Sequence, residues 1–441
     1  MKKLNATHDP LRWSWVESAN QPSCDFPIQN LPLGVFSVDG QKRAGVAIGD
    51  KIVDLQQVLN AKLIDGDAAI AIRATEGGQL KGLMALGNDC ASALRSQLSD
   101  LLRSDSPQLL RARELEHQIL LPIDSVAMEL PCEIGDYTDF LTSQHHTERH
   151  GRFKGLKDPL PPAFKSLPVA YHGRASSIRV SGTAVTRPNG QYKDAQGQLA
   201  FGPAPMLDFE LELAAFVARG NTMSEPIPIR AVQDYIFGYC LLNDWSAKSI
   251  QWWEQVLGPF LGKNFISSIS PWIVTSEALL PFRLPAPRRP TSDPVPLPYL
   301  QGDEDQRAGG IDIELEAWMS TSTQRHEQRQ PVRITHTHLQ NLYWTFGQML
   351  THHASNGCNL RAGDLIGSGT ISGSDDASRA CITELTHAGA DPLVLGGGEC
   401  RLALEDGDEI ILKARAAHEG AVSIGFGECR GRICPAKNWP V

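Results

Sequence analysis

The chain has 441 residues, 41% of them hydrophobic and 21% charged, which is enough for two or three domains with a large buried core. The formal net charge of −9, without a block of like charges, argues against a nucleic-acid backbone or an anionic membrane as the main partner. No stretch approaches the roughly 18 apolar residues of a membrane span. Nine scattered cysteines without a CxxC pair indicate reduced thiols, and we expect a cytoplasmic protein.

The N-terminal region predicts a small β unit followed by helices. Residues 26–59 alternate strand-like pieces with the turn signals DG and GD. Residues 68–120 carry apolar side chains at spacings of three and four, with Ser and Asp capping signals. We therefore predict two domains, residues 1–130 and 131–441.

The second region predicts a β barrel or sandwich with long loops, because Gly and Pro separate many short apolar runs. Two helices interrupt this pattern. One is expected to begin at a cap formed by Asp244 or Ser246, and the other to place apolar residues of 342–353 on one stripe and end at Gly357. The proline-rich residues 281–298 are expected to form a loop.

Several carboxylates lie within or beside the predicted strands. In LDFELELAAFVA, alternation places Asp208, Glu210 and Glu212 on one strand face and apolar side chains on the other. The strand alone favours a solvated polar face, and the alternative is a row of oxygen ligands for a hard cation. Asp139 and Asp244 lie beside similar apolar runs, although an N-cap is the usual role of an Asp such as Asp244. Oxygen-only ligands favour Ca²⁺, Mg²⁺ or Mn²⁺ over zinc or copper.

A candidate base and a candidate cation accompany these carboxylates. His145 and His146 follow Asp139 closely, so a loop can return one imidazole to the carboxylates; a pair of exposed loop histidines is the alternative. Lys263 is either a surface residue or a cation facing developing negative charge. GxSxG, Walker and paired-glycine dinucleotide motifs are absent from the sequence, which argues against serine-hydrolase and nucleotide chemistry.

Taken together, a series of segments in order resembles the fumarylacetoacetate hydrolase family. These segments are DFPIQNLPLGVFS, IGDYTDF, YHGRASSI, LDFELE, LLNDWSAKSIQ, LGPFLGK, SPW, LTHHASNGCNLRAGDL and SGTISGSD. The resemblance implies a mainly β protein with some helix, built from an N-terminal SH3-like barrel domain and a C-terminal catalytic β-roll domain, and assembled as a homodimer. It also implies metal-dependent hydrolysis of the carbon-carbon bond of 4-fumarylacetoacetate to fumarate and acetoacetate, the last step of tyrosine and phenylalanine catabolism.

The resemblance also implies a role for individual residues. His146 would be the general base, oriented by Glu384, and the oxyanion would be held by Lys248, Gln251 and Lys263. The ligands of Ca²⁺ or Mg²⁺, with Mn²⁺ as a further candidate, would be Asp139, Glu210, Glu212 and Asp244. A second, structural Mg²⁺ would have Lys263 and Ser267 as neighbours. Substrate contacts would be Leu141, Lys154, Tyr171, Gln251, Gln255 and Thr370. No motif gives Asp208 a ligand role, so we expect it beside the site or at the surface.

This chain departs from the family mainly near the substrate. Lys248 and Lys154 stand where arginines occur and lose the bidentate fork of a guanidinium. Leu141 and Gln255 stand where tyrosines occur, and Ser267 replaces a threonine. Two alternatives therefore remain open: a hydrolase of another diketo acid, such as an acylpyruvate or fumarylpyruvate, and a non-enzymatic, calcium-stabilised binding module.

Overall fold

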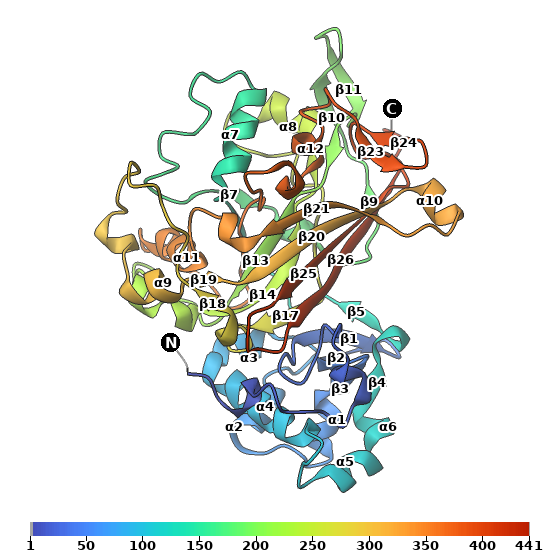
Figure 1. Cartoon of the computed structure of the whole chain (residues 1–441), viewed down its shortest axis with the longest axis vertical. Coiled ribbons are helices and arrows are strands. Elements are labelled where there is room, and N and C mark those ends of the chain that lie inside the picture. The colour runs from blue at the N-terminus through green and yellow to red at the C-terminus, as the bar shows by residue number, and fades with distance from the viewer. Residues whose placement is uncertain (1–2, 441) are drawn as a thin grey trace.

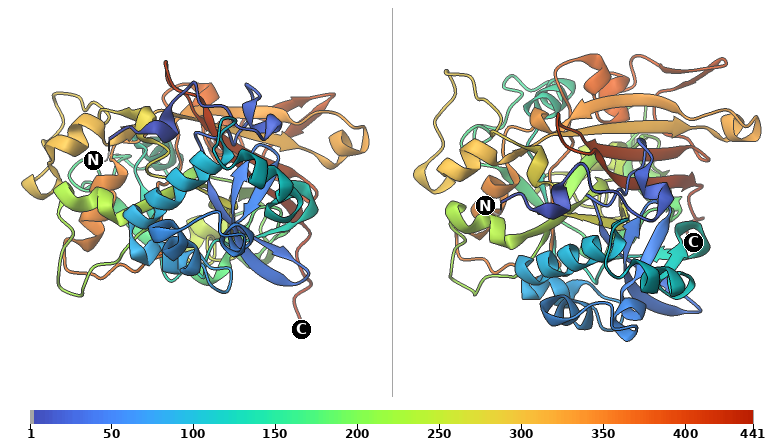
Figure 2. Two further views of the ribbon diagram at one scale, coloured as in Figure 1. Left: turned by 90° about the horizontal axis from the view of Figure 1, so that it is seen from below. Right: turned by 60° about the horizontal axis from the view of Figure 1, so that its bottom comes forward.

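The computed structural model describes residues 3–440 and confirms a mainly β protein with helices (Figure 1). The N-terminal strands are β1 (Leu33–Val38), β2 (Gln41–Ile48), β3 (Lys51–Asp54), β4 (Leu120–Pro122) and β5 (Ala127–Glu129). Between β3 and β4 lie α1 (Leu55–Asn60), α2 (Gly66–Arg73), α3 (Lys81–Leu86), α4 (Asn88–Leu102), α5 (Leu109–Glu114) and α6 (Glu116–Ile119). The predicted β unit and the helices after it are confirmed. Both lie at the lower end of the molecule in Figure 1 and face the viewer in the left view of Figure 2.

One large sheet joins this N-terminal unit to the rest of the chain. Its order is β4-β3-β2-β1-β17-β14-β13-β22-β6-β7, with β5 on β1 and with β16 on both β14 and β8. The new strands are β6 (Tyr137–Leu141), β7 (Val169–Gly173), β8 (Ile178–Val180), β13 (Leu211–Val217), β14 (Ile236–Asn243), β16 (Ser267–Ile269), β17 (Trp272–Thr275) and β22 (Leu365–Gly367). Because β1 pairs directly with β17, the sheet crosses the domain division, which stays a prediction.

A second sheet packs against the first and has the order β21-β20-β25-β26-β9. Its strands are β9 (Val185–Thr186), β20 (Ile313–Ser320), β21 (Val332–His338), β25 (Glu409–Ala416) and β26 (Ile424–Cys434). Small two-stranded sheets are β10 (Asn189–Lys193) with β11 (Leu199–Pro203), β12 (Leu207–Asp208) with β15 (Ser246–Ala247), β18 (Arg283–Leu284) with β19 (Gly310–Ile311), and β23 (Leu393–Gly396) with β24 (Glu399–Arg401). The remaining α-helices among residues 3–440 are α7 (Gln144–Phe153), α8 (Lys248–Glu254), α9 (Asp303–Ala308), α10 (Ser322–His326), α11 (Phe346–Ala354) and α12 (Ile382–Leu385).

The central strands β13 and β14 are buried on both faces. Along β13, Leu213 and Ala215 enter one hydrophobic core, whereas Ala214 and Phe216 enter another. Every residue of β13 is buried, including Glu212. The interpretation of Glu210 and Glu212 as members of a solvated face is therefore wrong, because neighbouring layers cover both sides of this strand.

Two helix boundaries and one loop differ from the sequence predictions. Helix α8 begins at Lys248 with Ala247 at its N-cap, so neither Asp244 nor Ser246 caps it. Helix α11 begins only at Phe346, because Thr345 caps it by accepting a hydrogen bond from the backbone of the third helical residue. The predicted loop around the histidine pair is instead helix α7. Among residues 3–440, none of the helices is long and apolar enough to span a bilayer.

Candidate active site

Adjacent strands bring the predicted metal-binding carboxylates together. Asp139 lies in β6, Glu212 lies at the start of β13, and Asp244 follows the end of β14. The start of β13 meets the end of β14 because the two strands are antiparallel, and β22 connects β13 to β6. Glu210 comes from the short break before β13. One carboxylate oxygen from each residue lies within 4.8 Å of the others, and all four side chains are buried.

Two buried lysines balance part of this negative charge. Lys248 Nζ lies 2.5 Å from Glu210 Oε1. Lys263 Nζ contacts Glu210 Oε2 and lies 2.7 Å from Asp244 Oδ2. Burial opposes ionisation of Glu210, but the two ammonium groups hold the pKa of Glu210 well below its usual range. Lys263 donates and offers no lone pair, so it acts as an ion-pair partner of the cluster and not as a metal ligand.

The carboxylate cluster fits a divalent cation. Four carboxylates and two ammonium groups leave a formal charge of −2 in a buried site. Both side-chain oxygens of Glu212 are buried and accept no hydrogen bond from any residue within 3–440. Burial and the neighbouring carboxylates raise the pKa values of Asp139 and Glu212 well above their usual range. An oxygen-coordinated cation satisfies the unpartnered oxygens and the residual charge together.

Glycine provides the space that Asp139 occupies. Gly367 of β22 lies opposite Asp139 in the parallel pair with β6. A Cβ atom at Gly367 would lie 2.4 Å from Asp139 Oδ1, which is closer than side-chain carbon atoms approach. The backbone N–H of Gly369 donates to the same oxygen at 3.2 Å. These contacts orient the carboxyl group toward the other three.

Helix α7 and helix α12 together build a histidine–carboxylate dyad. The Ser143 hydroxyl accepts a hydrogen bond from the N–H of His146 and caps α7. His146 Nδ1 lies 3.0 Å from Glu384 Oε2, and Glu384 also accepts from Ser372 Oγ at 2.5 Å and Arg149 Nη1 at 3.0 Å. Burial alone would raise the pKa of Glu384, but His146, His150 and Ser372 lower it well below its usual range. An ionised Glu384 fixes the Nδ1–H tautomer, which leaves Nε2 of His146 free to accept a proton.

Asp208 holds the helix that carries Glu384. Its side chain accepts hydrogen bonds from the N–H of Ile382 at 2.6 Å, the N–H of Thr383 at 3.0 Å and the Thr383 hydroxyl at 2.6 Å. Asp208 is 1% exposed. Of the two predicted placements, beside the site or at the surface, the first is confirmed. The carboxylate of Asp208 occupies the N-terminus of α12 and satisfies N–H groups that have no intrahelical partner.

A cavity of about 850 Å³ brings most of the predicted residues together. Its lining includes Asp139, Leu141, His146, Lys154, Tyr171, Glu210, Glu212, Lys248, Gln251, Gln255, Lys263 and Thr370. Asp244, Ser267 and Glu384 lie behind this lining and are fully or nearly fully buried. Tyr171 and Ser267 donate to the two oxygens of Asp244 at 2.6 Å and 2.9 Å. Tyr171, predicted as a substrate contact, thus also orients a carboxylate of the cluster.

Sequence reasoning missed several residues around the dyad, namely Arg149, His150, Ser372 and Cys381. His150 lies one turn after His146 on α7, and their ring centroids are 4.2 Å apart. Cys381 Sγ lies 3.4 Å from Glu384 Oε2 and 3.8 Å from His150 Nε2. The spacing of His146 and His150 was visible as HHTERH, but it signals a shared face only once the segment is known to be a helix.

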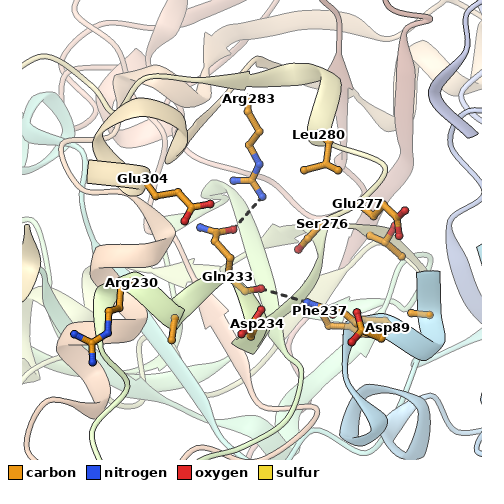
Figure 3. Close-up of a pocket in the computed structure, with 14 residues that line it drawn as sticks. Asp89, Arg230, Gln233, Asp234, Phe237, Ser276, Glu277, Leu280, Arg283 and Glu304 are labelled. Atoms are coloured by element: carbon orange, nitrogen blue, oxygen red, sulfur yellow. Dashed lines mark hydrogen bonds between the residues drawn. The ribbon is translucent and has the colours of Figure 1, made fainter. Parts of the chain in front are cut away.

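A second, smaller cavity of about 380 Å³ lies between the start of α4 and the region around β17 (Figure 3). Arg283 reaches toward Gln233 there, with Nη2 3.3 Å from Oε1. Its walls carry separate acidic and basic side chains, including Asp234 and Arg230. The groups of metal-ligating side chains found within residues 3–440 lie elsewhere, in and behind the larger cavity. The candidate active site is therefore the larger cavity.

Two family models together match most of the chain. Residues 137–434 match the family model for the fumarylacetoacetate (FAA) hydrolase C-terminal domain, and residues 29–131 match the model for the fumarylacetoacetase N-terminal domain. A protein of Oryza sativa subsp. japonica named Fumarylacetoacetase is 43% identical over 438 residues, covering 98% of this chain and 99% of the relative. The Bos taurus protein of the same name is 44% identical, covering 93% and 97%. A solved structure, fumarylacetoacetate hydrolase from Exiguobacterium antarcticum, is 17% identical with a TM-score of 0.49 and covers 92% of this chain and 100% of its own. The two family models and the full-length relatives show that this chain belongs to the fumarylacetoacetate hydrolase family.

Proposed function

We propose that the protein is a divalent-metal-dependent hydrolase that cleaves 4-fumarylacetoacetate to fumarate and acetoacetate. The observation that carries this proposal is the placement of the His146–Glu384 dyad and the carboxylate cluster at one cavity. Full-length relatives named Fumarylacetoacetase support the choice of substrate. Tyrosine and phenylalanine catabolism follows as the metabolic context of this reaction.

Hydrolysis of a 1,3-diketone requires a base for water and stabilisation of the leaving enolate. His146 Nε2 takes a proton from water, and Glu384 holds the imidazole in the required tautomer and stabilises the imidazolium that forms. Asp139, Glu210, Glu212 and Asp244 would hold a divalent ion, which would supply Lewis acidity for the negative charge of the leaving group. The proton on His146 is then available to the departing carbon, so the dyad acts first as base and then as acid.

Several hydrogen-bond donors line the cavity and can stabilise the oxyanion that forms when water attacks. Lys248 and Lys263 each have three N–H bonds, of which the contacts with Glu210 and Asp244 use only some. Gln251 lies on α8, one turn after Lys248, and lines the same cavity. Donors already placed by ion pairs need little reorganisation as charge develops, so they stabilise the transition state more than the ground state.

Specificity is assigned to lining residues that belong neither to the dyad nor to the carboxylate cluster. Lys154 is an exposed cation at the end of α7 and suits a substrate carboxylate, whereas Leu141, Gln255 and Thr370 supply apolar and neutral polar contacts. The test is a spectrophotometric assay of purified protein against fumarylacetoacetate, acylpyruvates and fumarylpyruvate at saturating metal. We expect fumarylacetoacetate to have the highest kcat/KM. Preference for an acylpyruvate would replace the substrate assignment, and no turnover of any of them would refute the hydrolase proposal in favour of a binding module.

We further propose Mg²⁺ or Ca²⁺ as the bound ion, with Mn²⁺ as a substitute, because the ligands are all oxygens. Metal analysis of protein purified without added metal, followed by chelation and reloading with each ion, decides among them. We expect chelated protein to recover activity with a hard divalent cation. Full activity of metal-stripped protein would refute the Lewis-acid role.

A homodimer is also part of the proposal. Val256, Leu257 and Phe260 are 89%, 102% and 63% exposed and form an apolar segment after α8, beside the cavity. Such a segment suits contact with a second copy. We expect Val256→Asp to shift the mass measured by light scattering from that of a dimer toward that of a monomer. The control is Val295→Asp, which changes another exposed valine (78% exposed) away from this segment and should leave the mass unchanged. A monomeric unmodified protein would contradict the dimer.

A cytoplasmic location is proposed because none of the nine cysteines is paired.

A further inference from the structure

A second group of metal-ligating side chains lies next to the carboxylate cluster. It consists of His146, His150, Cys381 and Glu384, all of them buried, with one ligand atom of each within 4.8 Å of the others. The histidines share one face of α7, and Cys381 is the N-cap of α12, three residues before Glu384. The proposed reaction uses His146 and Glu384 and leaves His150 and Cys381 without a role.

The distances within this group match a tetrahedral site. His146 Nδ1 to Glu384 Oε2 is 3.0 Å, Cys381 Sγ to Glu384 Oε2 is 3.4 Å, and Cys381 Sγ to His150 Nε2 is 3.8 Å. Tetrahedral Zn²⁺ with bonds of about 2.0 Å to N or O and about 2.3 Å to S has ligands about 3.3 to 3.6 Å apart. These three distances lie within about 0.3 Å of the tetrahedral values. The other ligand atoms of the group lie within 4.8 Å of one another, so an ion fits once the side chains close toward it.

We propose that His146, His150, Cys381 and Glu384 form a second, inhibitory metal site for Zn²⁺ or another thiophilic divalent ion. Imidazole and thiolate ligands select such ions, whereas the neighbouring oxygen-only cluster selects hard ions. Occupation removes the catalytic base, since His146 Nδ1 must then bind the metal and no longer donates to Glu384. The inhibition, but not the binding, rests on the proposed function of His146.

The ion has a route to these ligands. His146 and His150 line the active-site cavity, and Cys381 lies directly behind them. On binding, the Cys381 thiol releases one proton to solvent and the ring proton of His146 moves from Nδ1 to Nε2. Metal–sulfur and metal–nitrogen bonds form, and no atom is oxidised or reduced. Arg149 remains on Oε1 of Glu384, which leaves Oε2 to turn toward the ion.

Cobalt absorption tests binding independently of any catalytic assay. We would titrate Co²⁺ into protein already saturated with Mg²⁺ and record the near-ultraviolet thiolate-to-cobalt charge-transfer band. The carboxylate cluster contains no sulfur, so that band distinguishes a thiolate site from the cluster, and the Cys381 variant assigns the band to this group. We expect the band in the native protein and in Cys132→Ser, which removes a buried cysteine elsewhere, and its loss in Cys381→Ser and in His150→Gln. Absence of the band in the native protein, or its persistence in folded Cys381→Ser, overturns the site.

Inhibition is then measured with Zn²⁺ in excess Mg²⁺. Loss of one ligand is expected to raise the Zn²⁺ concentration for half-inhibition by at least about tenfold, which is the smallest effect typical of perturbed metal sites. Cys381→Ser keeps a small donor beside Glu384, so its activity without Zn²⁺ should stay close to that of the native protein. Equal Zn²⁺ sensitivity of Cys381→Ser and the native protein overturns the inhibitory role, even if the cobalt band is present.

Discussion

The carboxylate cluster and the His146–Glu384 dyad share a cavity but differ in electrostatic balance. The cluster is buried with a formal charge of −2 and includes Glu212, whose oxygens have no donor within residues 3–440. The dyad is satisfied by protein groups alone, because Glu384 accepts from His146, Arg149 and Ser372. The first therefore requires an added cation, whereas the second is preorganised without one. Mutations should separate the two regions cleanly.

The largest expected effect is on the dyad. His146→Ala should lower kcat by at least about 100-fold, because general-base catalysis contributes 10² to 10⁴ in rate. The content of Mg²⁺ or Ca²⁺ should stay near that of the native protein, since His146 is not a ligand of the carboxylate cluster. The matched control is His145→Ala, which removes the adjacent imidazole on α7 and should retain most activity. Near-native turnover of His146→Ala would remove it from the mechanism.

Asp305 is a buried carboxyl group outside both clusters, and burial is the largest influence on its pKa. Its oxygens accept from the Thr345 hydroxyl at 2.9 and 3.0 Å, and burial raises its pKa from 3.8 to about 6. Between about pH 4 and 6 the folded protein keeps a proton that the unfolded chain has released. The free energy of unfolding should therefore fall as pH rises through this window, by about 3 kcal/mol in total.

Asp305→Asn should remove this part of the pH dependence. We expect denaturant unfolding to show the variant gaining stability relative to the native protein between pH 4 and pH 7. The control is Asp303→Asn on the same helix, an exposed position where the change should be small. A constant difference between Asp305→Asn and native protein across that range would contradict the assignment.

Glu212→Gln should act in opposite directions on metal binding and on metal-free stability. The loss of one charge should weaken binding of the divalent ion. The metal-free protein loses a buried, unpartnered carboxyl group, so its free energy of unfolding should rise by about 1 to 3 kcal/mol. Chelated samples compared by thermal unfolding, together with metal analysis, measure both. Glu210→Gln is the contrasting variant, because it leaves Lys248 and Lys263 without their shared counter-charge and should destabilise the protein.

Asp208→Ala should produce the smallest effect. It removes the cap of α12, which costs about 1 kcal/mol of stability, and lets Glu384 move relative to His146. We expect kcat to fall while KM and metal content change little. Asp208→Asn keeps a cap oxygen and should restore much of the loss. Equal kcat for the alanine variant and the native protein would show that α12 stays in place without this cap.

The sequence predicted the parts of the site that depend on local patterns or family motifs. The large cavity contains or adjoins all the residues assigned by resemblance, from Asp139 to Glu384. Alternation could not predict the burial of Glu210 and Glu212, because the polar face of a strand can lie against either water or a buried site. The cap formed by Asp208 was also hidden, since it joins residues 174 positions apart. Such contacts depend on tertiary packing and leave no periodic signal.

The pairing of β1 with β17 has a consequence for cooperativity. Leu33 and Gly34 pair with Ile273 and Trp272, and Phe26 packs on Trp272 with ring centroids 5.4 Å apart. Removing the N-terminal unit would turn β17 into an open sheet edge and expose an aromatic side chain, which favours edge-to-edge aggregation. The N-terminal unit therefore protects the edge of the sheet that builds the active site, and we expect the C-terminal region alone to aggregate. The two regions should unfold in a single thermal transition.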